Sequence, residues 1–459
     1  MGRTKRVRRR KRAVSADSSV DVDGRLAELV GWMRRHRWSG PGPLRPALFP
    51  DTGRGLLSRR PLQPGATLVS IPLSLLVSSA TALRSELGAA LRAARPAVSA
   101  QLAVSLWLAL ERRRGADSGW RPYLASLPSA YTTPAYCEPR ELSADLLPEA
   151  LLSAARLQHA AVRRNLLRAR RLLRETSAPC VAGWELSEEE LRHAWVTVKT
   201  RAMCVEPEED LGNAPSGLKD DNCALAPFLD LFNHRPGATV YSSVSDGCYR
   251  LMTEHGVAAG EQVFIDYGPR DNLQLVLDYG FVVPGNERDA VPVPAEWVPL
   301  PAEAQRAADD ARLRSFLSVG REGYSRDLLT RLYLAALPEQ ELASVDGQEV
   351  QCMSLQELTA PAAVRRTLAA LLVRLVRHLE SCLAAQRAMP APSDALRVCS
   401  ALLREWLLVL QGHVWERGRR PGADGVVRPV YGTRLGDVVT ESVIHGAGGE
   451  LTVEMCADG

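Results

Sequence analysis

The sequence has no long hydrophobic run. No stretch of about 18 consecutive uncharged apolar residues occurs in its 459 residues, so we expect no membrane-spanning helix. The first residues, MGRTKRVRRRKRAVSAD, lack the apolar segment of a secretory signal peptide. Hydrophobic residues make up 46% of the chain and charged residues 24%, which is ordinary for a globular protein. We therefore predict a protein of the nucleus and cytoplasm, large enough for one large domain or two to three ordinary ones.

Clustered metal ligands and common nucleophile motifs are also absent from the sequence. None of the nine cysteines belongs to a CxxC pair, and the eight histidines form no HxH or HxxxH pair. We therefore expect no metal site and no disulfide framework. No GxSxG motif is present, and the Gly-Arg-Gly at 53–55 lacks the third glycine of a dinucleotide-binding loop. These absences argue against a metal centre, a serine nucleophile and a dinucleotide site.

The excess of positive charge is confined to the N-terminal end. Residues 1–12 contain eight arginines and lysines, and without them 49 basic side chains remain against 53 acidic ones. The folded body is therefore expected to be slightly acidic and the basic run to be a disordered arm. Such a run fits a nuclear-import signal or weak contact with nucleic-acid phosphates. A solvated arm with neither role fits the same residues.

Strand-like and helical patterns alternate in long blocks rather than as repeated βαβ units. Short strand-like pieces occupy 45–72 and 224–268, whereas amphipathic helical patterns fill about 85–198 and 300–412. This order excludes a Rossmann sheet and predicts an α+β fold of small sheets with a long helical insert, followed by an all-α domain. The predicted segments are a basic disordered tail (1–22), an N-terminal helix (23–43), a domain of small sheets (44–282) with its helical insert at about 85–198, a helical C-terminal domain (283–415) and an irregular tail (416–459).

Several local signals mark the ends of helices and strands. Ser187 with Glu190 three residues later has the pattern of a capping box. Ser245-Asp246-Gly247, between two strand patterns, indicates a hairpin turn. Asp271 or Asn272 is expected to cap the helix that follows.

Three polar residues interrupt the apolar run FLDLFNH, residues 228–234. Its phenylalanines and leucines predict a buried segment, in which each unpaired polar group would cost about 1–3 kcal/mol. Asp230, Asn233 and His234 therefore need partners from a satisfied core, a metal ion or a bound ligand. Taken alone, the segment favours a structural pair over a ligand site, and the sequence offers too few further ligands for a metal.

Four stretches taken together, in their order along the chain, resemble the SET-domain methyltransferases: DTGRGLL (51–57), TRAM (200–203), FLDLFNH (228–234) and VFIDYGPRDNLQLVLDYGF (263–281). WRPYLASLPSAYTTP (120–134) and the lack of cysteine clusters are similar to the branch typified by the plant Rubisco large-subunit lysine methyltransferase. The resemblance covers about residues 45–282, and the helical C-terminal region looks like that family's substrate-binding domain. The implied activity is methyl transfer from S-adenosyl-L-methionine to lysine side chains of a histone or non-histone protein.

The resemblance also implies roles for individual residues. Tyr267, at the end of a predicted strand, is implied as the catalytic residue. The implied cofactor-binding residues are Thr52, Arg54, Thr200, Asp230, Asn233, His234 and Tyr267. The implied substrate-binding residues are Arg201, Tyr279 and Phe281, and the family's second channel tyrosine corresponds to Tyr241 or Tyr249.

Simpler roles fit some of these residues equally well. Asp230 could only orient Asn233, Arg201 could form a surface ion pair, and Phe281 could pack in a core. Two other functions also fit the sequence: methylation of histidine, which a related SET branch performs, and a catalytically silent scaffold that binds partners through its helical domain. We expect a monomer that acts on a protein substrate and has no membrane contact.

Overall fold

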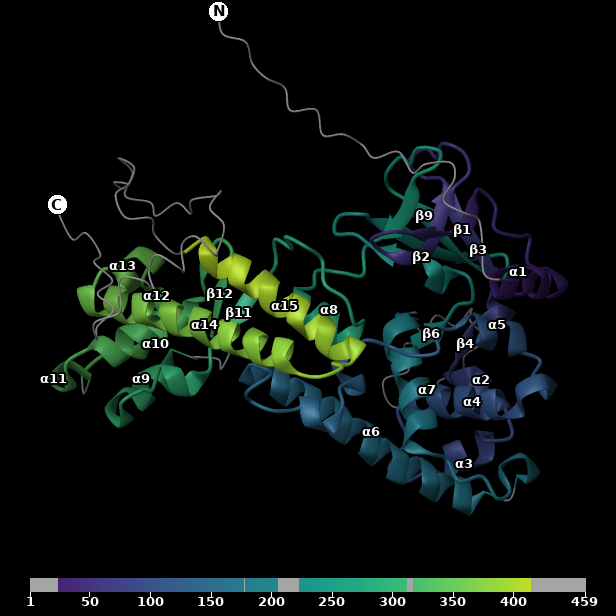
Figure 1. Ribbon diagram of the computed structural model, residues 1–459, viewed down its shortest axis with the longest axis horizontal. Coiled ribbons are helices and arrows are strands. Elements are labelled where there is room, and N and C mark those ends of the chain that lie inside the picture. Colours follow the sequence, from purple (N-terminus) through teal and green to yellow (C-terminus); the bar gives the residue numbers. More distant parts are fainter. Residues whose placement is uncertain (1–23, 177, 205–222, 312–316, 343, 414–459) are drawn as a thin grey trace, which may run out of the picture. The chain divides into compact units, whose positions relative to one another are not determined.

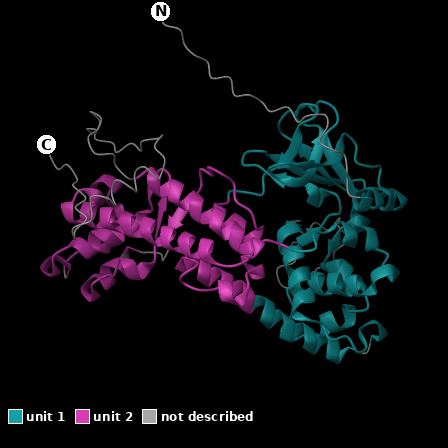
Figure 2. Cartoon of the chain, viewed as in Figure 1, with its two compact units in different colours: residues 1–130, 161–269 teal, residues 131–160, 270–459 magenta. Residues whose placement is uncertain are grey.

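The computed structural model describes residues 24–413, except for residues 177, 205–222, 312–316 and 343. The predicted tails, and with them the basic run, therefore lie outside the described residues. The chain divides into two compact units, residues 1–130 with 161–269 and residues 131–160 with 270–459 (Figure 2). The sequence had suggested a boundary near residue 282. Residues 270–282 belong to the second unit because Val276 lies in its hydrophobic core, and residues from 131–160 contribute to the same core.

The described residues of unit 1 form three small sheets (Figure 1). In the first sheet the order is β1–β2–β10–β7, and its pairs are antiparallel except for β10 with β7, which is parallel. The other two sheets, β3–β9–β8 and β4–β6–β5, are antiparallel throughout. The strands are β1 (Leu44–Phe49), β2 (Gly53–Ser58), β3 (Thr67–Pro72), β4 (Val77–Ser78), β5 (Met203–Cys204), β6 (Cys223–Leu225), β7 (Asn233–His234), β8 (Val240–Ser245), β9 (Cys248–Thr253) and β10 (Gln262–Ile265).

The Gly-Arg-Gly segment, which lies within the strand-like stretch 45–72, forms the beginning of strand β2. Residues 50–52 form the turn, and residues 53–55 already pair with β1. A Cβ on Gly55 would lie 2.6 Å from Gln262 Nε2 and 2.8 Å from Asn233 Nδ2. Glycine at this position therefore allows the backbone of β2 to approach side chains of β10 and β7 closely.

The helices of unit 1 fill most of the predicted insert, where α4 packs against α2 and α7. The capping box at the start of α7 is confirmed: Glu190 N donates to Ser187 Oγ at 3.1 Å, and Ser187 N donates to Glu190 Oε2 at 2.8 Å. The helices are α1 (Gly24–Arg35), α2 (Ser79–Arg84), α3 (Gly88–Ala93), α4 (Ala100–Arg114), α5 (Arg121–Ser126), α6 (Glu149–Glu175) and α7 (Glu188–Arg201). Helix α6 begins in unit 2, and its residues from 161 onward belong to unit 1.

Two turns show how local residues set the ends of elements. Helix α1 stops at Arg35 rather than near 43, because Arg37 and Gly40 have φ angles of 66° and 109°, left-handed values that a right-handed helix cannot continue. The predicted hairpin is confirmed: Asp246 and Gly247, with φ angles of 51° and 66°, form the two-residue turn between β8 and β9. Positive φ at both central residues is the signature of a type I′ turn.

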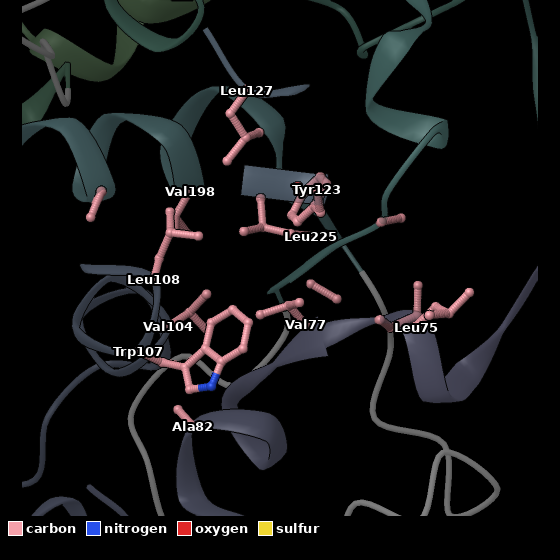
Figure 3. Close-up of a cluster of buried hydrophobic side chains, with 14 of the residues drawn as sticks. Leu75, Val77, Ala82, Val104, Trp107, Leu108, Tyr123, Leu127, Val198 and Leu225 are labelled. Atoms are coloured by element: carbon pink, nitrogen blue, oxygen red, sulfur yellow. The ribbon is translucent and has the colours of Figure 1, made fainter. Parts of the chain in front are cut away.

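The core of unit 1 joins its sheets to its helical insert. Figure 3 shows part of it, with Tyr123 of α5 close to Leu225 of β6, and with side chains of α4 and α7 in the same cluster. Tyr123 and Leu225 are both fully buried. Because burial of such side chains contributes about 1.5–3 kcal/mol each, this core holds the strand ends firmly in place.

Unit 2 is mainly helical and has one small antiparallel sheet of order β11–β12–β13. Helix α14 packs against α15, and α15 also contacts α8 and β11. Asp271, one of the two predicted caps, accepts a hydrogen bond from Gln274 N at the start of α8. The elements are α8 (Asn272–Asp278), β11 (Ala290–Pro292), α9 (Gln305–Asp310), β12 (Ser318–Gly320), β13 (Gly323–Tyr324), α10 (Arg326–Ala336), α11 (Glu339–Leu342), α12 (Gly347–Cys352), α13 (Leu355–Thr359), α14 (Ala362–Ala388) and α15 (Asp394–Gln411). In the described part of the chain, no helix combines the length and apolar character needed to cross a membrane.

Candidate active site

The FLDLFNH segment is a buried turn that leads into strand β7. Phe228 has a φ of 70°, residues 229–231 form one 3₁₀ turn, and the phenylalanine and leucine side chains are all buried, as predicted. Strand β7 then pairs in parallel with β10, with His234 opposite Ile265. Tyr267 follows β10 by two residues, so this pairing brings it next to His234.

Tyr267 is held by the FLDLFNH segment at both its backbone and its side chain. Its hydroxyl donates to the Phe232 carbonyl at 2.6 Å, and its backbone N–H donates to His234 Nδ1 at 3.0 Å. The two rings stack, with centroids 5.1 Å apart and planes 30° from parallel. Because Nδ1 accepts from the Tyr267 amide, the proton of the neutral His234 ring lies on Nε2.

Asp266 fixes the turn that follows Tyr267. One carboxylate oxygen accepts from Gly268 N at 2.9 Å and the other from Gly237 N at 2.8 Å. The same carboxylate lies 3.7 Å from His234 Nδ1. Since that nitrogen accepts from Tyr267, the Asp266–His234 contact is not an ion pair. Asp266 therefore acts on the backbone around Tyr267.

Asn233 joins strand β7 to the start of β2. Its Nδ2 donates to the Arg54 carbonyl at 2.9 Å and lies 3.4 Å from the Thr52 carbonyl. Thr52 Oγ1 in turn donates to Gln262 Oε1 at 2.9 Å. Gln262 Nε2 is buried and has no hydrogen-bond partner among the described residues. The candidate cofactor residues Thr52 and Asn233 thus form one polar cluster, together with Gln262.

The Asp230 carboxylate is buried and is contacted by one positively charged side chain and one hydroxyl donor. Its side chain is only 3% exposed, its carboxylate lies 3.3 Å from Arg201 Nη1, and Tyr123 Oη donates to it at 3.2 Å. Arg201 Nη1 also donates to the Asp230 carbonyl at 2.8 Å. Burial raises the pKa of Asp230, and Arg201, Tyr123 and Arg54 oppose that rise. This carboxylate and Asn233 share no hydrogen bond among the described residues.

Arg54 and Thr200 are held by backbone carbonyls. Arg54 Nη1 donates to the Ser126 carbonyl at 2.9 Å, at the end of α5. Thr200 Oγ1 donates to the Val196 carbonyl of its own helix at 2.8 Å. Arg54 therefore links β2 to α5, whereas Thr200 shares no hydrogen bond with the other candidates among the described residues.

Tyr279 and Phe281 belong to unit 2, whereas all the other candidate residues belong to unit 1. Tyr279 caps the C-terminal end of α8, and its ring centroid lies 6.1 Å from that of Phe281. The Arg270 guanidinium lies 5.4 Å from the Tyr279 ring centroid and pairs with Asp278 at 2.7 Å. Burial, assisted by Asp278, raises the pKa of Tyr279 against the effect of Arg270. The two rings thus form a half-buried aromatic pair beside a cation.

The two candidates for a second channel tyrosine lie on neighbouring strands. Tyr249, on β9, is buried, whereas Tyr241, on β8, is 43% exposed. Neither hydroxyl forms a hydrogen bond with Tyr267 among the described residues. Hydrogen bonding to the catalytic candidate therefore does not choose between them.

Sequence reasoning missed Tyr123, Gln262 and Asp266. Gln262 and Phe264 are two residues apart on β10, and because side chains of a strand alternate between its faces, both lie on the same face. Asp266 directly precedes Tyr267-Gly268, and an aspartate two residues before an amide commonly accepts from it. Tyr123 gave no polar signal in the sequence because its ring packs in the core.

Comparison with known proteins gives the family. A model of the SET domain matches residues 53–268. SET domain-containing protein 4 of Mus musculus is 36% identical over 75% of this chain and 80% of its own length. The chain belongs to the SET-domain methyltransferases. The actin-histidine N-methyltransferase of Drosophila melanogaster is 30% identical over 60% of this chain and 52% of its own length. The fold also matches the SET domain of LSMT bound to lysine and AdoHcy, with a TM-score of 0.61, 20% identity, and coverage of 85% of this chain and 90% of that one.

The cluster around Gly55 fits the methyl donor of this family, S-adenosyl-L-methionine. The amino-acid end of that cofactor carries an ammonium group, which needs acceptors, and a carboxylate, which needs donors. The two atoms nearest to a Cβ on Gly55 are amide nitrogens, Gln262 Nε2 and Asn233 Nδ2. Gln262 Nε2 is a buried donor without a hydrogen-bond partner among the described residues, which suits the carboxylate, and Asn233 Oδ1 is an acceptor without one, which suits the ammonium group. No group of three or more histidine, cysteine, aspartate or glutamate side chains in the described part of the chain could hold a metal ion.

Proposed function

We propose that this methyltransferase modifies lysine side chains of a protein, histone or non-histone, with Tyr267 as the catalytic residue. The observation that carries the proposal is the double attachment of Tyr267 to the 232–234 backbone and ring. This attachment directs its hydroxyl from the end of β10 toward the segment that contains Asn233. Of the known proteins matched, the SET domain of LSMT binds lysine.

The chemistry requires a neutral amine. S-adenosyl-L-methionine supplies an electrophilic methyl group on a sulfonium. A free lysine titrates near 10.4, so about one in a thousand is neutral at physiological pH, a deficit of roughly 4 kcal/mol. Burial of the lysine side chain and a nearby positive charge both favour the neutral form.

Tyr267 can aim that amine. Its hydroxyl proton is held by the Phe232 carbonyl, so the phenolic oxygen is oriented as an acceptor for an N–H group. The incoming amine can donate one N–H to this oxygen and present its lone pair elsewhere. Holding the reacting atoms in line in this way removes much of the entropic cost of the displacement.

Labelling tests the proposal directly. The full chain is incubated with radiolabelled S-adenosyl-L-methionine and proteins of a cell lysate, and mass spectrometry then locates the methyl groups. We expect methyl-lysine with the unchanged chain, almost none with Tyr267→Phe, and unchanged labelling with Tyr333→Phe, a half-buried tyrosine of unit 2. Unaltered turnover in Tyr267→Phe would refute the catalytic role. A chain that binds no S-adenosyl-L-methionine in calorimetry would favour the silent scaffold.

Histidine is the second candidate acceptor, favoured by the 30% identity to an actin-histidine N-methyltransferase. A neutral imidazole nitrogen needs no deprotonation at pH 7, so the two acceptors predict different pH profiles. A lysine reaction should keep accelerating from pH 7 to 9, whereas a histidine reaction should level off above about pH 7. Mass spectrometric location of the methyl group on an imidazole would replace lysine with histidine in the proposal. We also propose action in nucleus and cytoplasm, which fractionation of cells that express the chain would test.

A further inference from the structure

The WRPYLASLP segment (120–128) supports the family resemblance, yet the proposed mechanism gives it no role. It forms helix α5 and the turn that follows. Trp120 packs against Trp32 and Trp107, with ring centroids 5.2 and 5.3 Å away, which anchors the start of the helix. Such tilted and edge-to-face aromatic contacts add about 0.5–1.5 kcal/mol beyond burial in other proteins. The segment is therefore a rigid support.

Three contacts connect this support to the rest of unit 1, and two of them reach candidate site residues. Tyr123 Oη donates to the Asp230 carboxylate, the Ser126 carbonyl accepts from Arg54, and the Pro128 carbonyl accepts from His193 Nε2 at 2.8 Å. Of these three hydrogen bonds, the one from Tyr123 uses a side chain of α5, and the other two use backbone carbonyls of the segment. Its ring is fully buried among the apolar side chains of Figure 3, so the position of its hydroxyl is set by the core.

The Asp230 contact reaches the catalytic tyrosine through one short turn. Asp230 lies in the 3₁₀ turn 229–231, and Phe232 N closes that turn on the Leu229 carbonyl at 3.1 Å. The next acceptor along the chain, the Phe232 carbonyl, receives the Tyr267 hydroxyl proton. A shift of the Asp230 carboxylate therefore moves the carbonyl that orients Tyr267.

We propose that Tyr123 is a positioning residue for methyl transfer, because it holds Asp230 and thereby the Phe232 carbonyl that orients the Tyr267 hydroxyl. The inference rests on the proposed function for its kinetic consequence, but the chain of contacts stands independently. Arg201 shares the task, since it binds both the carboxylate and the backbone carbonyl of Asp230. Among the described residues, Tyr123 forms a hydrogen bond with the buried Asp230 carboxylate and Arg201 forms an ion pair with it. Loss of either one leaves it less firmly fixed.

The test removes one hydroxyl with Tyr123→Phe in the full chain. At 3.2 Å the Tyr123–Asp230 bond is longer than usual, so we expect kcat to fall by about fivefold, equivalent to ~1 kcal/mol, for the acceptor identified by labelling. KM for S-adenosyl-L-methionine should stay within about twofold, because the Asn233 contacts are untouched. Because a lower folded fraction would also reduce the apparent kcat, kcat is expressed per S-adenosyl-L-methionine-binding site counted by calorimetry; a merely structural role would leave that value unchanged.

Spectroscopy separates this proposal from the proposed function. In protein with ¹³Cζ-labelled tyrosine, the Tyr267 resonance is assigned by its loss in Tyr267→Phe. The ¹³Cζ chemical shift of Tyr267 should change in Tyr123→Phe and remain unchanged in the matched control Tyr333→Phe. If Tyr123→Phe does not fold, the near-isosteric Asp230→Asn should move the same resonance. A Tyr267 resonance that stays at its original position in a folded variant overturns the inference, whether or not any acceptor is methylated.

Discussion

Acidification should destabilise unit 1 through a single buried histidine, His193 of α7. Its ring is 6% exposed, its Nε2–H donates to the Pro128 carbonyl, and Arg112 Nη1 lies 3.0 Å from Nδ1. Arg112 is equally close to Nε2, but the Pro128 carbonyl can only accept, so the proton belongs on Nε2 and Nδ1 accepts from Arg112. Burial, and after it the charge of Arg112, lowers the pKa of His193 from 6.5 to about 4, against the effects of Pro128 and Glu189.

The sign and size of the effect follow from proton linkage. Between pH 6.5 and 4 the unfolded chain binds a proton at this site and the folded chain does not, so the free energy of unfolding falls as the pH falls. The stabilisation is fully present above pH 6.5. At pH 5 it is reduced by about 2 kcal/mol, and below pH 4 by about 3 kcal/mol, at ~1.36 kcal/mol per pH unit.

Urea unfolding at pH 8, 6.5 and 5 measures this, with the His193→Gln variant as the comparison. Glutamine can donate to the Pro128 carbonyl but does not titrate, so the other ionisable groups cancel between the two proteins. Tryptophan fluorescence reports mainly on unit 1, which holds six of the nine tryptophans: Trp32, Trp38, Trp107, Trp120, Trp184 and Trp195. We expect the unfolding free energy of the unchanged chain to drop about 2 kcal/mol more than that of the variant between pH 8 and 5. Parallel pH dependence of the two proteins would refute the reasoning.

Three further substitutions test the site and its supports. Asn233→Ala should weaken S-adenosyl-L-methionine binding about tenfold in calorimetry, because the Arg54 carbonyl loses its donor; an unchanged Kd would contradict this. Gly55→Ala should lower both cofactor affinity and, by about 1–3 kcal/mol, the unfolding free energy, because its Cβ would overlap two side-chain amides. Gly31→Ala, in helix α1 with only an ordinary 3.7 Å contact, is the control and should stabilise by up to ~1 kcal/mol in urea unfolding. Ser187→Ala should lower the unfolding free energy by about 1 kcal/mol in the same assay through loss of the α7 cap, and an unfolding free energy equal to that of the unchanged chain would count against the capping box.

Local chemistry in the sequence was sufficient to predict many element ends. The turn at Asp246-Gly247 and the caps at Ser187 and Asp271 depend on side chains and backbone angles within four residues, so no distant contact could override them. The end of α1 was predicted too late because the apolar pattern continues past Arg35 to Trp38, which is buried against the body of unit 1. Burial of a residue does not show whether a helix carries it there.

The pairing of distant segments was less accessible from the sequence. Residues 53–55 contain two glycines, which weaken the strand signal, but the ladder with β1 makes them a strand, and pairing partners are set by the whole sheet. Family resemblance selected Asn233, His234 and Tyr267, which the structure places in one connected group. It could not reveal Tyr123, because the use of a core tyrosine's hydroxyl depends on which carboxylate the fold places beside it.

Four of the eight candidate residues of unit 1 share a property that links the fold to the site: each donates to a backbone carbonyl of another segment. Asn233 holds the Arg54 carbonyl of β2, and Tyr267 holds the Phe232 carbonyl before β7. Arg201 holds the carbonyl of Asp230, and Arg54 itself holds α5. Such bonds join residues 29 to 179 positions apart, so motifs that are scattered along the chain lie together in the fold. A substitution at any of them therefore changes the position of the backbone as well as any contact that the side chain makes with a ligand. Stability must be measured beside affinity before a loss of activity is assigned to either cause.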